Sequence, residues 1–99
     1  MRIYENLLLP VDEWYITSIL CLDDDGSFRF HEKWSCYAGS TDGNAKGTWS
    51  QTDDVVMLET VRIEGALRLG LVEGQKFAAF ERDDCLDFWN DFTMNLQRE

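Results

Sequence analysis

The stretch from Trp14 to Trp49 constrains the fold of this chain more than any other feature. Apolar residues alternate with other residues on both sides of Asp25-Gly26, and Gly47-Thr48-Trp49 follows further along. A period of two is typical of β-strands, and a short turn containing glycine between two such runs is typical of a β-hairpin. The pattern therefore predicts an antiparallel β-meander.

The run after this turn shows the alternation most clearly. Phe28, Phe30 and Trp34 share one face, while Arg29 and His31 belong to the opposite face. Because a shift of one residue would move every side chain to the other face, this pattern fixes the register. Glu32 interrupts the apolar face. The interruption indicates either a bulge or a carboxylate that points into a cavity.

Several further elements follow from turn and strand signals. The polar, glycine-rich residues 39–47 (GSTDGNAKG) predict a hairpin loop, and Thr52-Asp53-Asp54 predicts a second tight turn. Residues 3–9 fit either a short helix or an edge strand that ends at Pro10. The later strands are expected in four places: around Trp49, and over residues 55–63, 67–71 and 77–80.

The spacing of apolar residues changes near the C-terminus. Phe88, Trp89 and Phe92 recur at helical spacing, and Asp84 is a suitable N-cap. A helix from Asp84 to about Gln97, packed on the sheet, is the expectation. The predicted fold class is thus mainly β (α+β): an antiparallel meander of about six strands that forms a curved sheet or small barrel, with a C-terminal amphipathic helix.

Length and charge limit the functions that the chain can perform. Its 99 residues fit one domain, 1–99, and its net charge of −10 disfavours binding to the phosphates of a nucleic acid. No apolar run approaches the length of roughly 20 residues that spans a bilayer. Met1–Leu9 lacks the features of a signal peptide. An odd number of cysteines, three, suits a reducing compartment. A cytoplasmic protein without a membrane partner is expected.

Candidate chemical motifs all have a simpler structural explanation. Cys21–Glu32 matches part of a calcium-binding loop, but its first ligand position is a cysteine and its flanks alternate like strands. His31 is the single histidine, and adjacent strand residues such as His31 and Glu32 point to opposite faces. Cys21, Cys36 and Cys85 show no CxxC spacing. The sequence predicts no catalytic residue, no metal site and no cofactor.

Aspartates occur in clusters at the predicted turns. Asp23, Asp24, Asp53 and Asp54 belong to two of these turns, and Asp83-Asp84 marks a third cluster. Turn conformations alone favour aspartate. If alternate hairpin tips share one end of the sheet, however, two of these clusters form one acidic rim suited to a basic protein partner.

Part of this chain resembles small lipocalin-like, calycin-type β-barrel domains. The resemblance rests on Trp14, the segment Leu20-x-Leu22-x-x-Asp25-Gly26-x-Phe28, Gly47-x-Trp49 and Val56-x-Leu58, about half of the chain. It implies an up-and-down barrel or half-barrel, often with an apolar cavity. About six strands are expected here, where a full lipocalin barrel has eight.

Two function classes remain. The first is a non-enzymatic, acidic protein-binding module, such as an immunity protein or other inhibitor of a basic partner. The second is a small carrier or sensor of an apolar ligand, whose pocket is lined by Trp14, Phe28, Phe30, Trp34 and Trp49.

Overall fold

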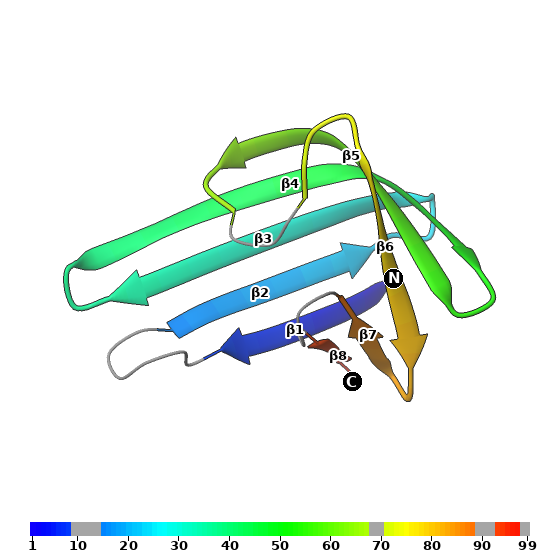
Figure 1. Ribbon diagram of the computed structural model, residues 1–99, viewed down its shortest axis with the longest axis horizontal. Coiled ribbons are helices and arrows are strands. Elements are labelled where there is room, and N and C mark those ends of the chain that lie inside the picture. Colours follow the sequence, from blue (N-terminus) through cyan, green and yellow to red (C-terminus); the bar gives the residue numbers. More distant parts are fainter. Residues whose placement is uncertain (9–14, 68–70, 89–92, 98–99) are drawn as a thin grey trace.

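The computed structural model describes residues 1–8, 15–67, 71–88 and 93–97 of the chain, and these residues form a β-barrel (Figure 1). The strands are β1 (Arg2–Leu8), β2 (Tyr15–Leu22), β3 (Ser27–Cys36), β4 (Gly39–Thr52), β5 (Val55–Gly65), β6 (Lys76–Arg82), β7 (Cys85–Asp87) and β8 (Thr93–Leu96). No part of the described chain is a helix, so none of it is a helix long and apolar enough to cross a membrane.

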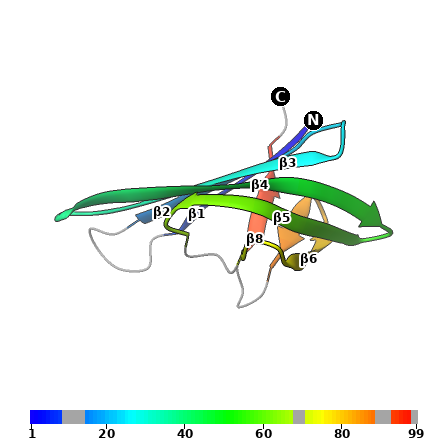
Figure 2. The ribbon, with the colours of Figure 1, turned by 90° about the horizontal axis from the view of Figure 1, so that it is seen from above.

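Each strand pairs antiparallel with the next, and the sheet closes between its first and last strands. Tyr4 of β1 lies opposite Leu96 of β8, and the Gln97 N–H donates to the Ile3 carbonyl at 2.7 Å. Figure 2 shows the broad sheet of β2–β5 from its edge, with β6 on one side of it. The predicted antiparallel meander is confirmed, as is the coarse barrel architecture that the lipocalin-like resemblance implied. It has eight strands instead of six, and it closes.

Most of the individual strand predictions are confirmed. The opening segment is the strand β1 and not a helix, and Trp49 belongs to β4. The runs expected at 55–63 and 77–80 fall within β5 and β6. Residues 68–70 of the strand expected at 67–71 lie outside the described residues.

The expected C-terminal helix is wrong. Residues 85–87 and 93–96 are the strands β7 and β8, and Asp84 occupies the β6–β7 turn with a φ of 65° instead of capping a helix. The physical reason is that β1 and β6 would otherwise leave unpaired edges, and satisfying those backbone groups outweighs a weak helical preference. Trp89 and Phe92, on which the helical pattern depended, lie outside the described residues.

The hairpin loop expected at residues 39–47 is also wrong. β4 begins at Gly39 and pairs with β3 from Cys36↔Gly39 to Ser27↔Thr48, so the turn lies at Tyr37-Ala38. One glycine of this segment has a different purpose. A Cβ at Gly43 would collide with the Ala66 carbonyl oxygen, so glycine allows another backbone to cross close to the strand.

The inward face of the barrel carries one hydrophobic core. Its buried members are Tyr4, Leu20, Leu22, Phe28, Phe30, Ala45, Val56, Leu58, Leu71, Ala79, Leu86, Phe88 and Met94. Paired residues form rows across the strands: Leu20, Phe30 and Ala45 lie side by side on β2, β3 and β4. The next row holds Ser18, Glu32 and Gly43, so polar and small side chains replace the apolar ones there.

Glu32 is the inward carboxylate that the sequence suggested as one of two alternatives. It is buried, and the pairing of β3 with β2 runs from Ser35 to Phe28 without a bulge. Two hydroxyls join it in the interior: Ser18 Oγ and Thr60 Oγ1 are buried without a hydrogen-bond partner. The barrel interior is therefore apolar over most of its length, with one polar row at Ser18 and Glu32 and a separate hydroxyl at Thr60, which lies opposite Gly47.

Phe30→Ala should lower the free energy of unfolding by about 3–5 kcal/mol, because it removes a large ring from the middle of the core. The ring of Phe30 is 2% exposed, whereas that of Phe80, on the outer side of β6, is 52% exposed. Phe80→Ala is therefore the matched control, and its cost should stay below about 1 kcal/mol. Chemical denaturation of the two variants measures both values. Equal costs would show that the ring of Phe30 does not hold the core together.

Candidate functional site

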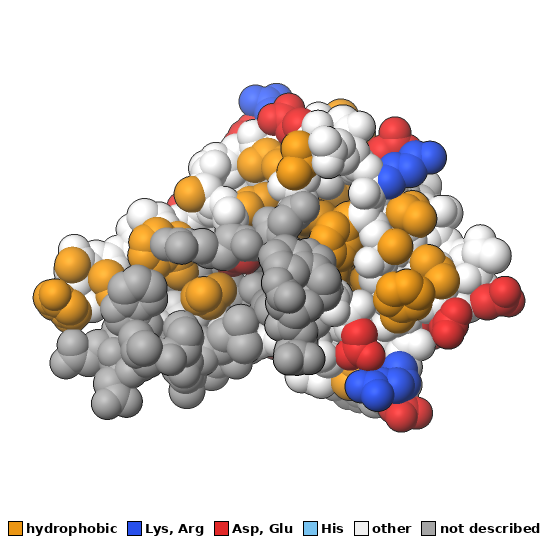
Figure 3. Space-filling model, in the orientation of Figure 1, with side chains coloured by type: hydrophobic (Ala, Val, Ile, Leu, Met, Phe, Trp, Pro, Cys, Tyr) orange, Lys and Arg blue, Asp and Glu red, His pale blue; other side chains and the backbone are white. Residues whose placement is uncertain are grey.

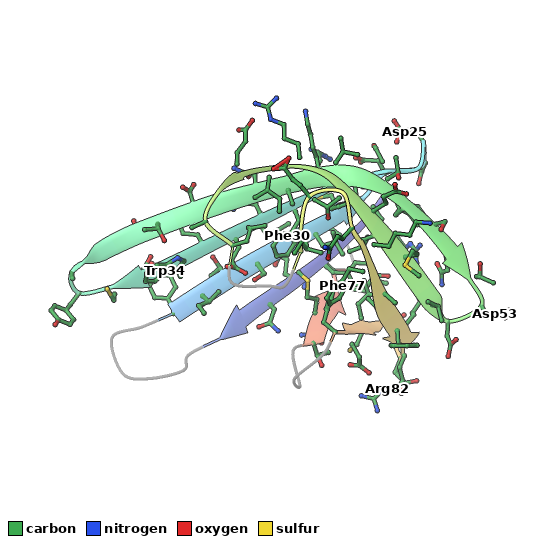
Figure 4. All side chains as sticks on the ribbon, turned by 45° about the horizontal axis from the view of Figure 1, so that its top comes forward. Asp25, Phe30, Trp34, Asp53, Phe77 and Arg82 are labelled. Atoms are coloured by element: carbon green, nitrogen blue, oxygen red, sulfur yellow. The ribbon has the colours of Figure 1, made fainter. Side chains whose placement is uncertain are left out.

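The barrel brings all three acidic turns to one end. Because consecutive strands alternate in direction, the β2–β3, β4–β5 and β6–β7 turns lie at the same end (Figure 1), and Figure 4 shows Asp25, Asp53 and Arg82 at that end. We call the aspartates of these turns the acidic rim: Asp23, Asp24, Asp25, Asp53, Asp54, Asp83 and Asp84. The four aspartates named from the sequence as partner-binding residues all belong to it.

The opposite end is different in character. Its β3–β4 turn carries Tyr37, whose surface is 83% exposed, followed by Ala38 and Gly39. Figure 3 shows acidic side chains, some with basic ones beside them, around a hydrophobic area on the right-hand side of the molecule, and hydrophobic side chains at its left-hand tip. The two ends therefore offer different surfaces to a partner.

Local hydrogen bonds fix the first turn of the acidic rim. The Ser27 hydroxyl donates to Asp25 Oδ1 at 2.6 Å and the Ser27 N–H donates to the same oxygen at 2.9 Å. These two bonds, the hydroxyl first, hold the pKa of the Asp25 carboxyl below its ordinary value. Gly26 follows with a φ of 88°, which glycine adopts without strain. Asp25 is therefore negatively charged at neutral pH and held in one orientation.

The other two turns hold aspartates in a left-handed backbone conformation. Asp53 has a φ of 56°, and Asp83 and Asp84 have φ values of 50° and 65°. Two-residue hairpin turns favour asparagine, aspartate and glycine at such positions, and glycine adopts the conformation without strain. Each turn joins its strands directly, since Thr52 pairs with Val55 and Arg82 pairs with Cys85.

The cations near the acidic rim are already engaged in ion pairs. The N-terminal amine lies 2.9 Å from Asp24, Arg29 lies 3.2 Å from Asp23, and Arg82 lies 3.3 Å from Asp87. Within the described ranges, Asp25, Asp53, Asp54 and Asp83 form no ion pair. The acidic rim thus keeps four carboxylates without an ion-pair partner, and all three turns contribute to them.

A polar network seals the barrel beneath the acidic rim. Arg2 donates to Glu81 at 2.8 Å and to Gln51 Oε1 at 2.8 Å, and its guanidinium lies 4.9 Å from the centre of the Trp49 ring. The Tyr4 hydroxyl completes the network at 3.2 Å from Glu81. We call these five residues, Arg2, Tyr4, Trp49, Gln51 and Glu81, the end seal. They join β1, β4 and β6 into one support for the rim.

The end seal changes the acidity of Tyr4. Burial raises the pKa of the Tyr4 phenol, Arg2 lowers it, and the Glu81 carboxylate raises it again, with a net increase above the ordinary value of 10.0. The phenol therefore stays protonated and available as a hydrogen-bond donor to Glu81 well beyond neutral pH.

The residues proposed from the sequence as a ligand pocket are spread along the barrel. Phe28 and Phe30 are buried within the core, and Trp49 belongs to the end seal, where its Nε1 donates to the Asp23 carbonyl at 2.8 Å. Trp34 lines a cavity of about 250 Å³ near the opposite end, beside Cys36 and Thr41. Trp14 lies outside the described residues. The four that are described do not line one pocket.

The remaining chemical candidates have structural roles where they are described. Asp23 and Asp25 turn the β2–β3 hairpin through bonds to Ser27, and His31 Nε2 lies 3.3 Å from Asp42 on the outer face. The three cysteines are free and half-buried. Among the residues that the structure covers, no group of three or more histidine, cysteine, aspartate or glutamate side chains is placed to hold a metal ion.

Sequence reasoning missed the end seal and the interior hydroxyls. Arg2 and Glu81 are 79 positions apart, and no local pattern connects them. The only available signal was the alternation of β1, which places Arg2 on the same face as Tyr4.

Comparison with known proteins adds nothing to this geometry: no protein-family model, curated protein or solved structure matches the chain.

The raised pKa of Tyr4 predicts that the fold weakens in alkali. A group whose pKa is higher in the folded state adds stability below its unfolded pKa, about 10, and loses that contribution as the pH rises through the folded value. The free energy of unfolding should therefore fall above about pH 10, and Tyr4→Phe should reduce this fall. Tyr37→Phe, which alters an exposed ring, is the control. The same alkaline slope in Tyr4→Phe as in the wild type would contradict the expectation.

Proposed function

We propose that this protein is a non-enzymatic binding module whose acidic rim docks onto a basic protein, in the manner of an immunity or inhibitor protein. The observation that carries the proposal is the convergence of the three acidic turns on one end of the barrel. Aspartates from segments far apart in the sequence lie at this one end, and the fold alone does not require these residues to be acidic.

Charge supports a basic protein as the partner. The uncompensated carboxylates of Asp53, Asp54 and Asp83, on a chain of net charge −10, produce a negative field at one end of the molecule. Such a field speeds encounters with a positively charged surface and repels phosphate-bearing partners. Three hairpin tips, spread over one end of the barrel, match the extent of a protein surface better than that of a small ligand.

Backbone strain supports a role for the charge itself. Glycine would meet the left-handed conformation of Asp53, Asp83 and Asp84 with less strain, and neither glycine nor asparagine would repel the neighbouring carboxylates. Relative to glycine, any side chain at these positions costs about 1 kcal/mol of backbone strain. A requirement for negative charge in binding accounts for their presence.

Rigidity supports the same proposal. The end seal fixes β1, β4 and β6 beneath the rim, and two of the turns contain only two residues. A surface that is ordered before binding loses less entropy when a partner docks. The acidic rim therefore fits an interface that forms without a large rearrangement.

A second candidate is a small apolar-ligand binding protein, and one observation favours it. The cavity of about 250 Å³ beside Trp34 lies at the end opposite the acidic rim, where Cys36, Ala38 and Thr41 form its other walls. This volume is slightly below that of usual small-molecule pockets, which begin near roughly 300 Å³. The cavity could hold only a compact ligand. Because ligand binding there would also not account for the acidic rim, this function is the second candidate.

The test compares two variants with the same change in charge. The rim variant Asp53→Asn, Asp54→Asn, Asp83→Asn removes three of the four rim carboxylates without an ion pair, and the control variant Glu5→Gln, Glu59→Gln, Glu73→Gln removes three exposed ones elsewhere. Basic proteins captured from the native lysate by the wild type are identified and purified, and their association and dissociation rates are measured at low and high salt. The rim variant should associate at least about tenfold more slowly at low salt, and the control should change little.

Stability measurements make the outcome unambiguous. The rim variant should unfold at the same or a slightly higher denaturant concentration than the wild type, because asparagine suits the left-handed turn positions. Equal loss of association in both variants would show that net charge, and not the rim, attracts the partner. Capture of no basic protein, together with an apolar compound that copurifies with the chain, would overturn the proposal and favour the second candidate.

A further inference from the structure

A row of basic residues crosses the outer face of the barrel. Arg29 of β3 lies opposite Lys46 of β4, and Lys46 lies opposite Arg62 of β5. Directly opposed residues on antiparallel strands have Cβ atoms about 4.5–5.5 Å apart. Three of the nine lysine and arginine residues in this acidic chain therefore stand side by side, and we call them the basic row.

The basic row is costly in the isolated protein, because like charges that face each other across strands are destabilising. Each arginine has one carboxylate partner: half-buried Asp23 accepts two contacts of 3.2 Å from Arg29, and exposed Glu64 lies 2.8 Å from Arg62. A single exposed ion pair such as that of Arg62 contributes little stability. Lys46, in the middle, has no ion-pair partner in the part of the chain that the structure describes. An anion placed over Lys46 would lie between the two arginines of the basic row.

The basic row borders a groove of about 370 Å³. Ile19 and Cys21 on β2 form its apolar side, and the aliphatic stems of Arg29 and Lys46 continue that wall. Arg62 and its ion-pair partner Glu64 line the other side. Cys21 lies directly opposite Arg29, so the apolar side and the basic row are neighbours in the sheet. Figure 2 shows β6 on the inner side of this sheet, and Figure 4 shows nitrogen-tipped side chains rising from its outer side.

We propose that this groove is a binding site for a phosphate monoester with a small apolar group. The phosphate would lie over Lys46 between the two arginines, and the apolar group would rest against Ile19 and Cys21. A dianion matches a row of three adjacent cations better than a carboxylate does, and arginine forms paired hydrogen bonds to phosphate oxygens. The site is on the outer face of the sheet, where the Arg29–Asp23 ion pair connects it to the acidic rim, and it does not depend on the function proposed for that rim.

The chemistry of the groove predicts which ligands it prefers. Small-molecule pockets usually have volumes of about 300 Å³ to about 1000 Å³, and the groove lies within that range. A charged head alone satisfies the basic row but leaves Ile19 exposed to water, whereas an apolar group alone leaves the cations unpaired. Only a ligand with both parts uses both walls.

Phenyl phosphate is the probe, and inorganic phosphate, benzoate and phenol are the comparison ligands. Each is titrated into the full chain, and binding is followed by the NMR chemical shifts of backbone amides. Phenyl phosphate should bind at least about tenfold more tightly than each of the other three, with shifts centred on β2–β5. Lys46→Gln should weaken its binding about tenfold or more, the loss expected for one charge-assisted hydrogen bond. Lys76→Gln, on exposed β6, is the control and should change nothing.

Two further variants separate the walls of the groove. Ile19→Ser should weaken the binding of phenyl phosphate but leave that of inorganic phosphate unchanged, and Arg62→Gln should weaken both. Without ligand, Lys46→Gln should melt at a higher temperature than the wild type, because it relieves repulsion in the basic row. Equal binding of phenyl phosphate and inorganic phosphate, unchanged binding in Lys46→Gln and Arg62→Gln, or shifts spread over other cations would each overturn the proposal.

Discussion

The pairing of β8 with β1 is the constraint on which the rest of this structure depends. A sheet with two free edges exposes backbone N–H and C=O groups, and closing it satisfies them. Closure of an antiparallel sheet whose neighbours are consecutive in sequence requires an even number of strands that alternate in direction. The alternation in turn decides which connections meet at each end. The acidic rim is therefore a result of topology as much as of sequence, since aspartates far apart in the chain meet because their turns have the same parity.

The same closure creates an interior that must be filled or sealed. Large rings such as Phe28 and Phe30 fill the middle of the barrel, while Arg2 and Glu81 close the end beneath the acidic rim. Charged side chains can occupy that position because each is hydrogen-bonded within the end seal, so their transfer from water is compensated. Outward-facing positions carry no such restriction. The outer face of β3–β5 can therefore hold a row of cations that the interior would exclude.

Strict alternation made much of the barrel predictable. Phe28 and Phe30 have one preferred face, and Asp25-Gly26 fixes the turn that sets their register, so the local pattern and the final structure agree. Residues 39–47 were not predictable in the same way. Their glycines resemble a loop, yet Gly43 serves the close approach of Ala66, a contact between distant segments that no local pattern records. The prediction of a C-terminal helix was wrong for a related reason. Apolar residues recur at helical spacing over residues 85–96, but β8 forms because it pairs with β1, at the other end of the chain.

Some residues of the candidate sites were likewise predictable from the sequence, and others were not. Asp23, Asp24, Asp53 and Asp54 were recognisable because acidic turns are visible in sequence, and their meeting at one end followed once strand pairing was known. The basic row was not recognisable, because Arg29, Lys46 and Arg62 are separated by intervals that acquire meaning only through the register, including the shift between Lys46 and Gly47. Register is a property of two strands together, so residues that it aligns stay hidden in a single sequence.

The barrel closes through two short strands, β7 and β8, which we call its seam. With three and four residues, against ten to fourteen in β3, β4 and β5, they contribute few hydrogen bonds to the closure. Transient opening is easiest where the fewest bonds must break together, so amide protons of β7 and β8 should exchange with solvent before those of β3 and β4. Each opening would briefly present the free edges of β1 and β6, and a strand from another molecule could pair with either edge. Strand pairing is thus most extensive around the basic row, and the barrel opens most readily at β7 and β8.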